Sequence, residues 1–289
     1  MSENRWQLIY IIWLKWRQQI RKPRVYVGYL AGGVCAFSVA CRYAGFSSGL
    51  GVQIMEPWIL MMNYWGDLLF LAIGFLAVIT DAPFVDSLSQ SVMLRSKSKR
   101  IWNQAMILYI MVHSLLYWMM IMLVSCIPCF FVKHHLSDQW SSTMKILLNV
   151  IPTNAITQYR LNPCSVQLLR ERAPFEAALW GFLMIVLCSV VMALFVYLVN
   201  LKTGRPLGAF AVLVIMLYSV LIIRDGGMNG LPFEASFLAH AIVDLHGSGG
   251  MSMISSLMLF VVLGGILTLS IKKVSKHCDY REVNGNRLW

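Results

Sequence analysis

Long apolar runs separated by short polar segments set the pattern of this chain. The run at 57–80 contains a single charged residue, and the run at 101–132 contains none. A helix that crosses the roughly 30 Å hydrocarbon core of a membrane needs about 20 apolar residues, so both runs are long enough to span it. The pattern predicts an all-α membrane protein whose six transmembrane helices lie at 25–44, 58–80, 102–131, 177–201, 206–223 and 251–271.

The polar and basic segment at 81–101 separates the second span from the third. Asp81 suits the N-cap of a helix, and the apolar residues Phe84, Leu88 and Val92 recur at helical spacing before Arg95. This spacing predicts a short surface helix that is presented to a soluble partner. The alternative is a basic loop that serves only to orient the protein in the membrane.

The first segment, 1–24, has one apolar and one polar face when it is wound as a helix. The apolar face carries Trp6, Ile9, Trp13, Trp16 and Ile20, and the polar face carries Lys15, Gln18 and Lys22. We expect an amphipathic helix that lies in the membrane interface on the cytoplasmic side, with its indoles at headgroup level. A packed soluble helix is the alternative.

The remainder, 25–289, is predicted to form one six-span domain with two unusual outer segments. The segment at 134–175 contains three prolines and an apolar stretch, which predicts a small folded cap rather than a simple loop. At 225–250, the apolar residues around Phe237 and Leu245 are spaced as on one face of a helix, which predicts an outer re-entrant or interfacial helix between spans five and six. A polar tail, 272–289, follows the last span.

Charge and composition favour a membrane partner over a nucleic acid. The net charge is +11, but 58% of the residues are apolar and no nucleic-acid-binding motif is present. Most of the 24 lysines and arginines fall in 1–24, in 81–101, between spans four and five, and after span six. Because cationic loops stay on the cytoplasmic side, both termini and the 81–101 segment are predicted to be cytoplasmic.

Polar residues inside the spans are the candidates for a translocation path. His113 lies one helical turn from Tyr109 and from Tyr117, so the three form a stripe along span three, and Asp67 lies in span two. These residues either face the path or are satisfied by neighbouring helices.

A second group of titratable residues lies in the outer segment at 225–250. His240 and Asp244 have the spacing of neighbours on one face of a helix, and His246 is close in sequence. A metal site or an intramembrane catalytic site is one interpretation, but histidine and acidic residues on a polar helix face are the simpler one, and no metal site is predicted. The seven cysteines form no zinc or disulfide framework.

The layout of the chain resembles the membrane subunit of ABC-2-type ABC transporters. The shared features are an amphipathic first helix, six spans, a helical loop after span two and an outer excursion between spans five and six. Locally, DAPFVDSLSQSVMLRSKSKRIWNQAMILYIMVHSLLYW is similar to the permeases of Gram-positive bacteria, with an Asp ending span two, a basic loop and a Trp opening span three.

This resemblance implies an exporter subunit in the bacterial cell membrane. The segment containing Asp81, Phe84, Leu88, Val92 and Arg95 would be a coupling helix that contacts a separate ATP-binding subunit, and a second permease copy or a related permease would complete the assembly. The sequence has no GxxxxGK[ST] motif, so ATP and magnesium would be bound by the partner, and this chain is expected to be no enzyme and to carry no cofactor.

The substrate implied by the resemblance is broad: an amphiphilic peptide, an antibiotic or a lipid-linked molecule. Two other functions stay open on the sequence. One is an intramembrane enzyme that uses His113 or the His240, Asp244 and His246 cluster. The other is a membrane anchor or sensor that recruits a soluble partner.

Overall fold

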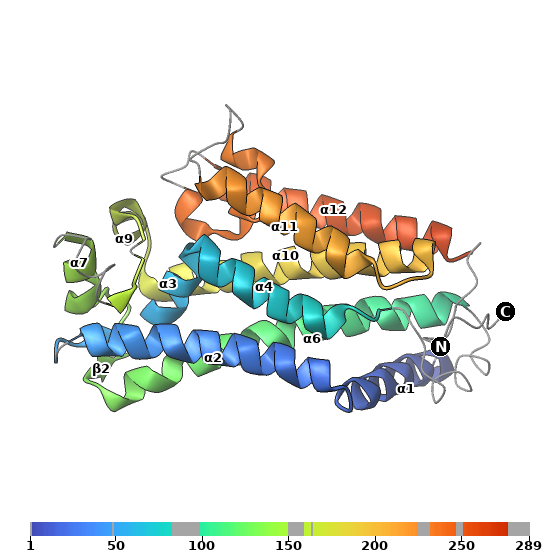
Figure 1. Cartoon of the computed structure of the whole chain (residues 1–289), viewed down its shortest axis with the longest axis horizontal. Coiled ribbons are helices and arrows are strands. Elements are labelled where there is room, and N and C mark those ends of the chain that lie inside the picture. Colours follow the sequence, from blue (N-terminus) through green and yellow to red (C-terminus); the bar gives the residue numbers. More distant parts are fainter. Residues whose placement is uncertain are drawn as a thin grey trace.

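Helices that lie along one long direction form almost all of this protein (Figure 1). The computed structural model describes residues 2–47, 49–82, 99–149, 159–162, 164–224, 232–246 and 251–276. Four described helices are long and apolar enough to cross a membrane, and a bent pair could supply a fifth span. The four are α2 (Pro23–Phe46), α6 (Lys99–Cys126), α10 (Pro174–Thr203) and α12 (Met253–Val274). The prediction of a helical membrane protein is therefore confirmed.

The predicted second span is broken rather than continuous. α3 (Glu56–Asn63) and α4 (Trp65–Ile79) meet at an angle of 90°, because Tyr64 adopts an extended conformation. Tertiary hydrogen bonds hold α3 in this orientation. The Trp58 indole donates to the carbonyl of Ala178 at 3.2 Å, and the side-chain oxygen of Asn63 accepts from the Asp244 amide at 3.1 Å. The expectation of one straight helix at 58–80 was wrong.

Predicted span five corresponds to α11 (Gly208–Arg224), which has 17 residues. Predicted span three corresponds to α6 followed by the short 3-10 helix η1 (Ile127–Phe131), and Pro128 lies at the start of η1. Proline cannot continue an α-helix without losing a hydrogen bond, so it ends α6 here.

α2 and α4 pass very close to each other at two glycines. A Cβ atom added to Gly28 would lie 2.5 Å from the Gly74 carbonyl oxygen, and one added to Gly74 would lie 2.7 Å from the Tyr117 hydroxyl. Only glycine allows this separation between the two helices. The glycines of the first span differ in how closely they are packed. A Cβ on Gly33 would meet nothing within 4 Å, in contrast to one on Gly28.

The described part of 134–175 contains short folded elements at the end of the molecule opposite the end of α12 (Figure 1). β2 (His134–His135) pairs in parallel with β1 (Val52–Gln53), and the short helices α7 (Ser142–Asn149) and α9 (Val166–Glu171) follow.

Glu56, which is fully buried, joins this cap to the bundle. Its carboxylate accepts hydrogen bonds from the Tyr43 hydroxyl at 2.7 Å, the Gln53 amide at 2.9 Å, and the amide and hydroxyl of Ser141 at 2.8 and 2.7 Å. These donors belong to α2, to β1 and to the start of the cap.

The described part of the outer segment between α11 and α12 is not one helix. It forms three single turns of 3-10 helix, which are η4 (Phe233–Ala235), η5 (Ala239–Ala241) and η6 (Val243–Leu245). The backbone is extended at Ser236 and Ile242, between the turns. Contacts to the spans outweigh the local preference for an α-helix. One such contact is the hydrogen bond that the Ser236 hydroxyl donates to the Ser219 carbonyl of α11 at 3.0 Å. The prediction of a continuous re-entrant helix was therefore wrong.

The glycine contact predicts a large difference between two chemically identical substitutions. Gly28→Ala should reduce the free energy of unfolding by about 1–3 kcal/mol, because backbone atoms cannot move away from the new methyl group. Gly33→Ala is the control and should be neutral or stabilising by up to about 1 kcal/mol, since it adds helix propensity without a clash. Unfolding in detergent measures both, and equal stability of the two variants would contradict the close contact.

Candidate functional site

Asp81 is the buried centre of a charged cluster at the end of α4. The residue is only 6% exposed. Its carboxylate accepts a hydrogen bond from the Gln19 amide at 2.7 Å and forms ion pairs with Lys22 and Arg24. Gln19 is the last residue of α1 (Ser2–Gln19), Lys22 lies in the turn that follows, and Arg24 lies in the first turn of α2. The cluster therefore fastens this turn to the end of α4.

Electrostatics keep the Asp81 carboxylate ionised. Burial by itself would raise its pKa, but Lys15, Lys22 and Arg24 outweigh burial and hold the pKa of this carboxyl well below its usual range. A buried carboxylate is stable only when charges and hydrogen bonds replace its lost hydration. From the sequence alone, these cations indicate only the orientation of the protein in the membrane. About 60 residues separate Asp81 from Gln19 and Lys22, so no local sequence pattern predicts that they interact.

The polar face of α1 points into the protein, because the Asp81 cluster lies there. Lys15 is only 1% exposed and Gln18 is buried, whereas Trp6 is 73% exposed and Ile9 and Trp13 also lie on the outside. Trp16 departs from the predicted division between two faces, because it is half-buried and lies against His113. The structure adds that the polar face contacts the bundle and leaves the apolar face on the outer surface.

Tyr109, His113 and Tyr117 do form a stripe on α6, and all three are buried. The stripe faces α1 and α2. His113 contacts the hydroxyl of Tyr29 at 3.2 Å and lies 5.3 Å from the Trp16 ring, centroid to centroid. The Tyr117 hydroxyl donates to the Leu71 carbonyl at 2.8 Å. His113 and Tyr117 are therefore bonded to neighbouring helices, whereas the Tyr109 hydroxyl has no hydrogen-bond partner among the described residues. A role of the stripe in a translocation path stays a prediction.

Several buried polar atoms between α1 and α6 have no hydrogen-bond partner among the described residues. They include the Gln18 amide group, the indole nitrogen of Trp102, the Tyr109 hydroxyl and Nδ1 of His113. A buried polar atom without a partner costs about 1–3 kcal/mol. Atoms of residues in the Asp81 cluster, such as Oε1 of Gln19 and Nε of Arg24, are also without a hydrogen-bond partner in this part of the structure.

Asp67 lies apart from the stripe, in the first turn of α4. A carboxylate in the first turn of a helix interacts favourably with the helix dipole, and Arg42 supplies a nearby positive charge. The predicted path residues are thus not brought together at one place. Phe84, Leu88, Val92 and Arg95 lie outside the described residues, so their role in coupling stays a prediction.

The outer histidines meet at a serine rather than at Asp244. Nδ1 of His240 and Nε2 of His246 lie 2.8 and 2.9 Å from the hydroxyl oxygen of Ser256, while Asp244 accepts hydrogen bonds from the amide and hydroxyl of Ser165. Burial lowers the pKa of both histidines, so both are neutral at pH 7. No group of three metal-binding side chains occurs in the described ranges, and the predicted pairing of His240 with Asp244 was wrong because the segment is not an α-helix.

Comparisons with known proteins give no match: no protein-family model, no curated protein and no solved structure matches this chain.

Neutralising Asp81 tests the charged cluster. Asp81→Asn should lower the free energy of unfolding by about 2–3 kcal/mol at pH 7, because it leaves partly buried cations without their counter-charge. The folded-state pKa of Asp81 is depressed, so its contribution is complete above the unfolded pKa of about 3.9 and is lost as the pH falls further. The difference between wild type and variant should therefore shrink below about pH 4.

The control for this substitution is Glu176→Gln. Glu176 pairs with Arg172 at 2.7 Å, but its side chain is 51% exposed. Solvent screens such a pair, so the loss should stay below about 0.5 kcal/mol. Chemical denaturation in detergent at several pH values measures both variants, and comparable losses at pH 7 would show that the Asp81 cluster does not stabilise the fold.

Proposed function

We propose that this chain is the membrane subunit of an ATP-driven exporter and that a separate ATP-binding subunit drives it through the segment after α4. The observation that carries the proposal is the anchoring of Asp81. Asp81 is the first residue of the predicted coupling segment, and it is fastened to α1 and α2 by Gln19, Lys22 and Arg24. A force applied to that segment would therefore act on several helices at once.

The proposed topology has six crossings, with α3 and α4 as one broken span and α11 as a short one. A helix of 17 residues is roughly 25 Å long, slightly less than the hydrocarbon core. Side-chain contacts support alternating directions. Tyr197 of α10 donates to Asn103 of α6, and the Asn200 amide donates to the carbonyls of Thr80 and Ala82. These contacts place the start of α6 with the ends of α4 and α10.

The same end of the molecule is proposed to face the cytoplasm. α1 begins there (Figure 1), and α12 ends there with two lysines in its last turn. Arg21, Lys22, Lys202 and Arg205 add further positive charge at this end. An excess of cations beside the spans is the usual property of cytoplasmic loops, and it supports cytoplasmic termini.

The packing suggests how motion would pass through the subunit. The Asn200 side chain binds the backbone of Thr80 and Ala82 and also accepts from the Gly208 amide at 2.7 Å, so it links α4, α10 and α11 at one point. The Gly28–Gly74 contact links α2 to α4 deeper in the bundle. Rigid elements joined in this way would move as a body when the coupling segment moves.

The cargo class rests on an apolar hollow between α10, α11 and α12. Its volume is about 270 Å³. Its described lining consists of apolar side chains, among them Val191, Phe195, Phe237 and Leu263. We propose a cargo with an apolar part, such as an amphiphilic peptide, an antibiotic or a lipid-linked molecule. A second copy of the chain, or a related permease, would complete the path.

The test is purification of the tagged protein in detergent followed by an ATP hydrolysis assay. Wild type should elute with a partner that hydrolyses ATP, and Phe84→Asp plus Leu88→Asp should lose both partner and activity, because two charges would interrupt the apolar ridge. Ser89→Asp plus Gln90→Asp is the control: it adds the same charge on the opposite side of the predicted helix and should retain the partner. Wild type that elutes without ATPase activity would contradict the exporter and leave the anchor or enzyme interpretation.

A further inference from the structure

Two histidines and a serine form a polar cluster between the outer 3-10 turns and α12. Nδ1 of His240 and Nε2 of His246 lie 2.8 and 2.9 Å from the hydroxyl oxygen of Ser256. His240 belongs to η5, His246 directly follows η6, and Ser256 lies in the first turn of α12. Ser256 is fully buried, whereas His240 and His246 keep 7% and 8% of their surface exposed, so the medium can reach the two rings.

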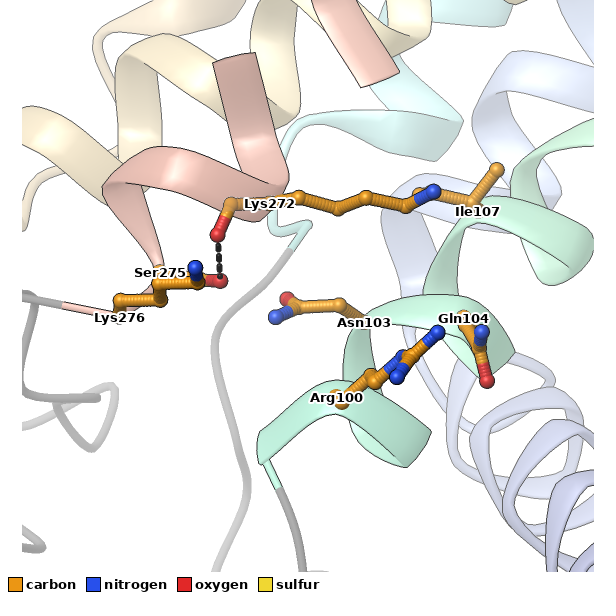
Figure 2. A pocket seen from close by; sticks show the side chains of 7 residues that line it. All are labelled: Arg100, Asn103, Gln104, Ile107, Lys272, Ser275 and Lys276. Atoms are coloured by element: carbon orange, nitrogen blue, oxygen red, sulfur yellow. Dashed lines mark hydrogen bonds between the residues drawn. The ribbon is translucent and has the colours of Figure 1, made fainter. Parts of the chain in front are cut away.

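Other serines on or beside α12 bond in the way that is common for helices. The Ser255 hydroxyl donates to the Ser252 carbonyl at 2.7 Å. At the opposite end of the helix, the Ser275 hydroxyl donates to the Lys272 carbonyl at 3.1 Å (Figure 2). The Ser256 hydroxyl faces two ring nitrogens from other elements instead. Its position is therefore not explained by bonding within the helix.

The second nitrogen of each ring determines where the ring carries its hydrogen. Nε2 of His240 lies 3.0 Å from the Glu234 carbonyl oxygen, and Nδ1 of His246 lies 2.8 Å from the Ile242 carbonyl oxygen. A carbonyl oxygen can only accept, so each of these nitrogens carries the one hydrogen of its neutral ring. The two nitrogens that face Ser256 are therefore both acceptors.

The cluster lacks one hydrogen while both rings are neutral. A hydroxyl has a single hydrogen, so Ser256 can donate to only one of the two nitrogens, and the other faces the hydroxyl oxygen without a hydrogen between them. A change of tautomer in either ring would only move the shortage to a carbonyl oxygen. One added proton completes every bond, because one ring then donates to Ser256 and the Ser256 hydroxyl donates to the other ring.

We propose that His240, Ser256 and His246 form a binding site for one proton from the medium. The proton forms an N–H bond on one ring nitrogen that faces Ser256, that ring becomes an imidazolium, and no bond between heavy atoms breaks. A second proton is excluded, since it would leave the Ser256 hydrogen without an acceptor and place two like charges side by side. The hydrogen bonds that join η5 and η6 to α12 thus change with pH. The site needs no ATPase partner, so it is tested separately from the exporter function.

The groups around the cluster favour His240 as the charged ring. Burial is the largest influence and lowers the pKa of both histidines, while hydrogen bonds to backbone carbonyls raise both. The carboxylate of Glu234 in η4 also raises the pKa of His240, whereas Arg172 after α9 lowers the pKa of His246. Asp244 of η6 is bonded to the serine that caps α9. Proton uptake therefore occurs below the ordinary histidine pKa of about 6.5.

The test is a pH titration of the full-length protein in detergent, followed by NMR of nitrogen-15 in the histidine rings. Above about pH 7, His240 should carry its hydrogen on Nε2 and His246 on Nδ1. On acidification, both rings should shift at the same pH and take up one proton between them. Ser256→Ala should weaken proton binding at least about tenfold and uncouple the two rings, because the imidazolium loses its acceptor. Ser255→Ala is the control and should titrate as wild type does.

The wild-type titration can overturn the site without any variant. Hydrogens on the same nitrogen of both rings, two independent titrations near about pH 6.5, or no uptake down to about pH 4 would each contradict it. An unchanged titration in Ser256→Ala would do so as well. If equimolar zinc shifts both rings above about pH 7, the two lone pairs bind a metal ion instead. Unfolding temperatures of the three proteins, which should agree within a few degrees, exclude misfolding as the cause.

Discussion

The ionised carboxylate of Asp81 is the constraint on which one end of this protein depends. A charge removed from water has to be paired, and its partners are the side-chain amide of Gln19 at the end of α1 and the cations of Lys22 and Arg24 at and just after the turn to α2. To supply them, α1 turns its polar face inward and leaves Trp6 and Trp13 outside. The position of the first helix therefore follows from a single acidic residue at the end of α4.

At the opposite end of the molecule, a different kind of partner stabilises the buried carboxylate of Glu56. Its hydrogen-bond partners among the described residues are neutral hydroxyl and amide donors, which come from α2, β1 and Ser141 of the cap. Four hydrogen bonds to one carboxylate hold α3 across the end of the bundle, and the chain bends at Tyr64 as a result. The two carboxylates thus fix both ends of the broken pair α3 and α4, and the Gly28–Gly74 contact fixes its middle.

The connections at the end of α4 bear directly on the proposed coupling. Ala82, the last described residue before Lys99, lies where the Asp81 cluster and the Asn200 hydrogen bonds converge. These bonds join the end of α4 to α1, α2 and α10.

The sequence by itself determined the helices and their approximate limits, because about 20 consecutive apolar residues have few other stable structures and because Pro128 and the charged segments interrupt them. It also separated Trp6, Ile9 and Trp13 of α1 from Lys15 and Gln18, although Trp16 of the predicted apolar face lies against His113. Only the tertiary structure decided the bend at Tyr64, the three 3-10 turns near His240 and the direction in which α1 faces. These features depend on hydrogen bonds and ion pairs between residues far apart in sequence, such as Asn63 with Asp244 and Lys22 with Asp81. Local periodicity contains no information about such partners, and the free energy of satisfying buried polar groups outweighs the local preference for a continuous helix.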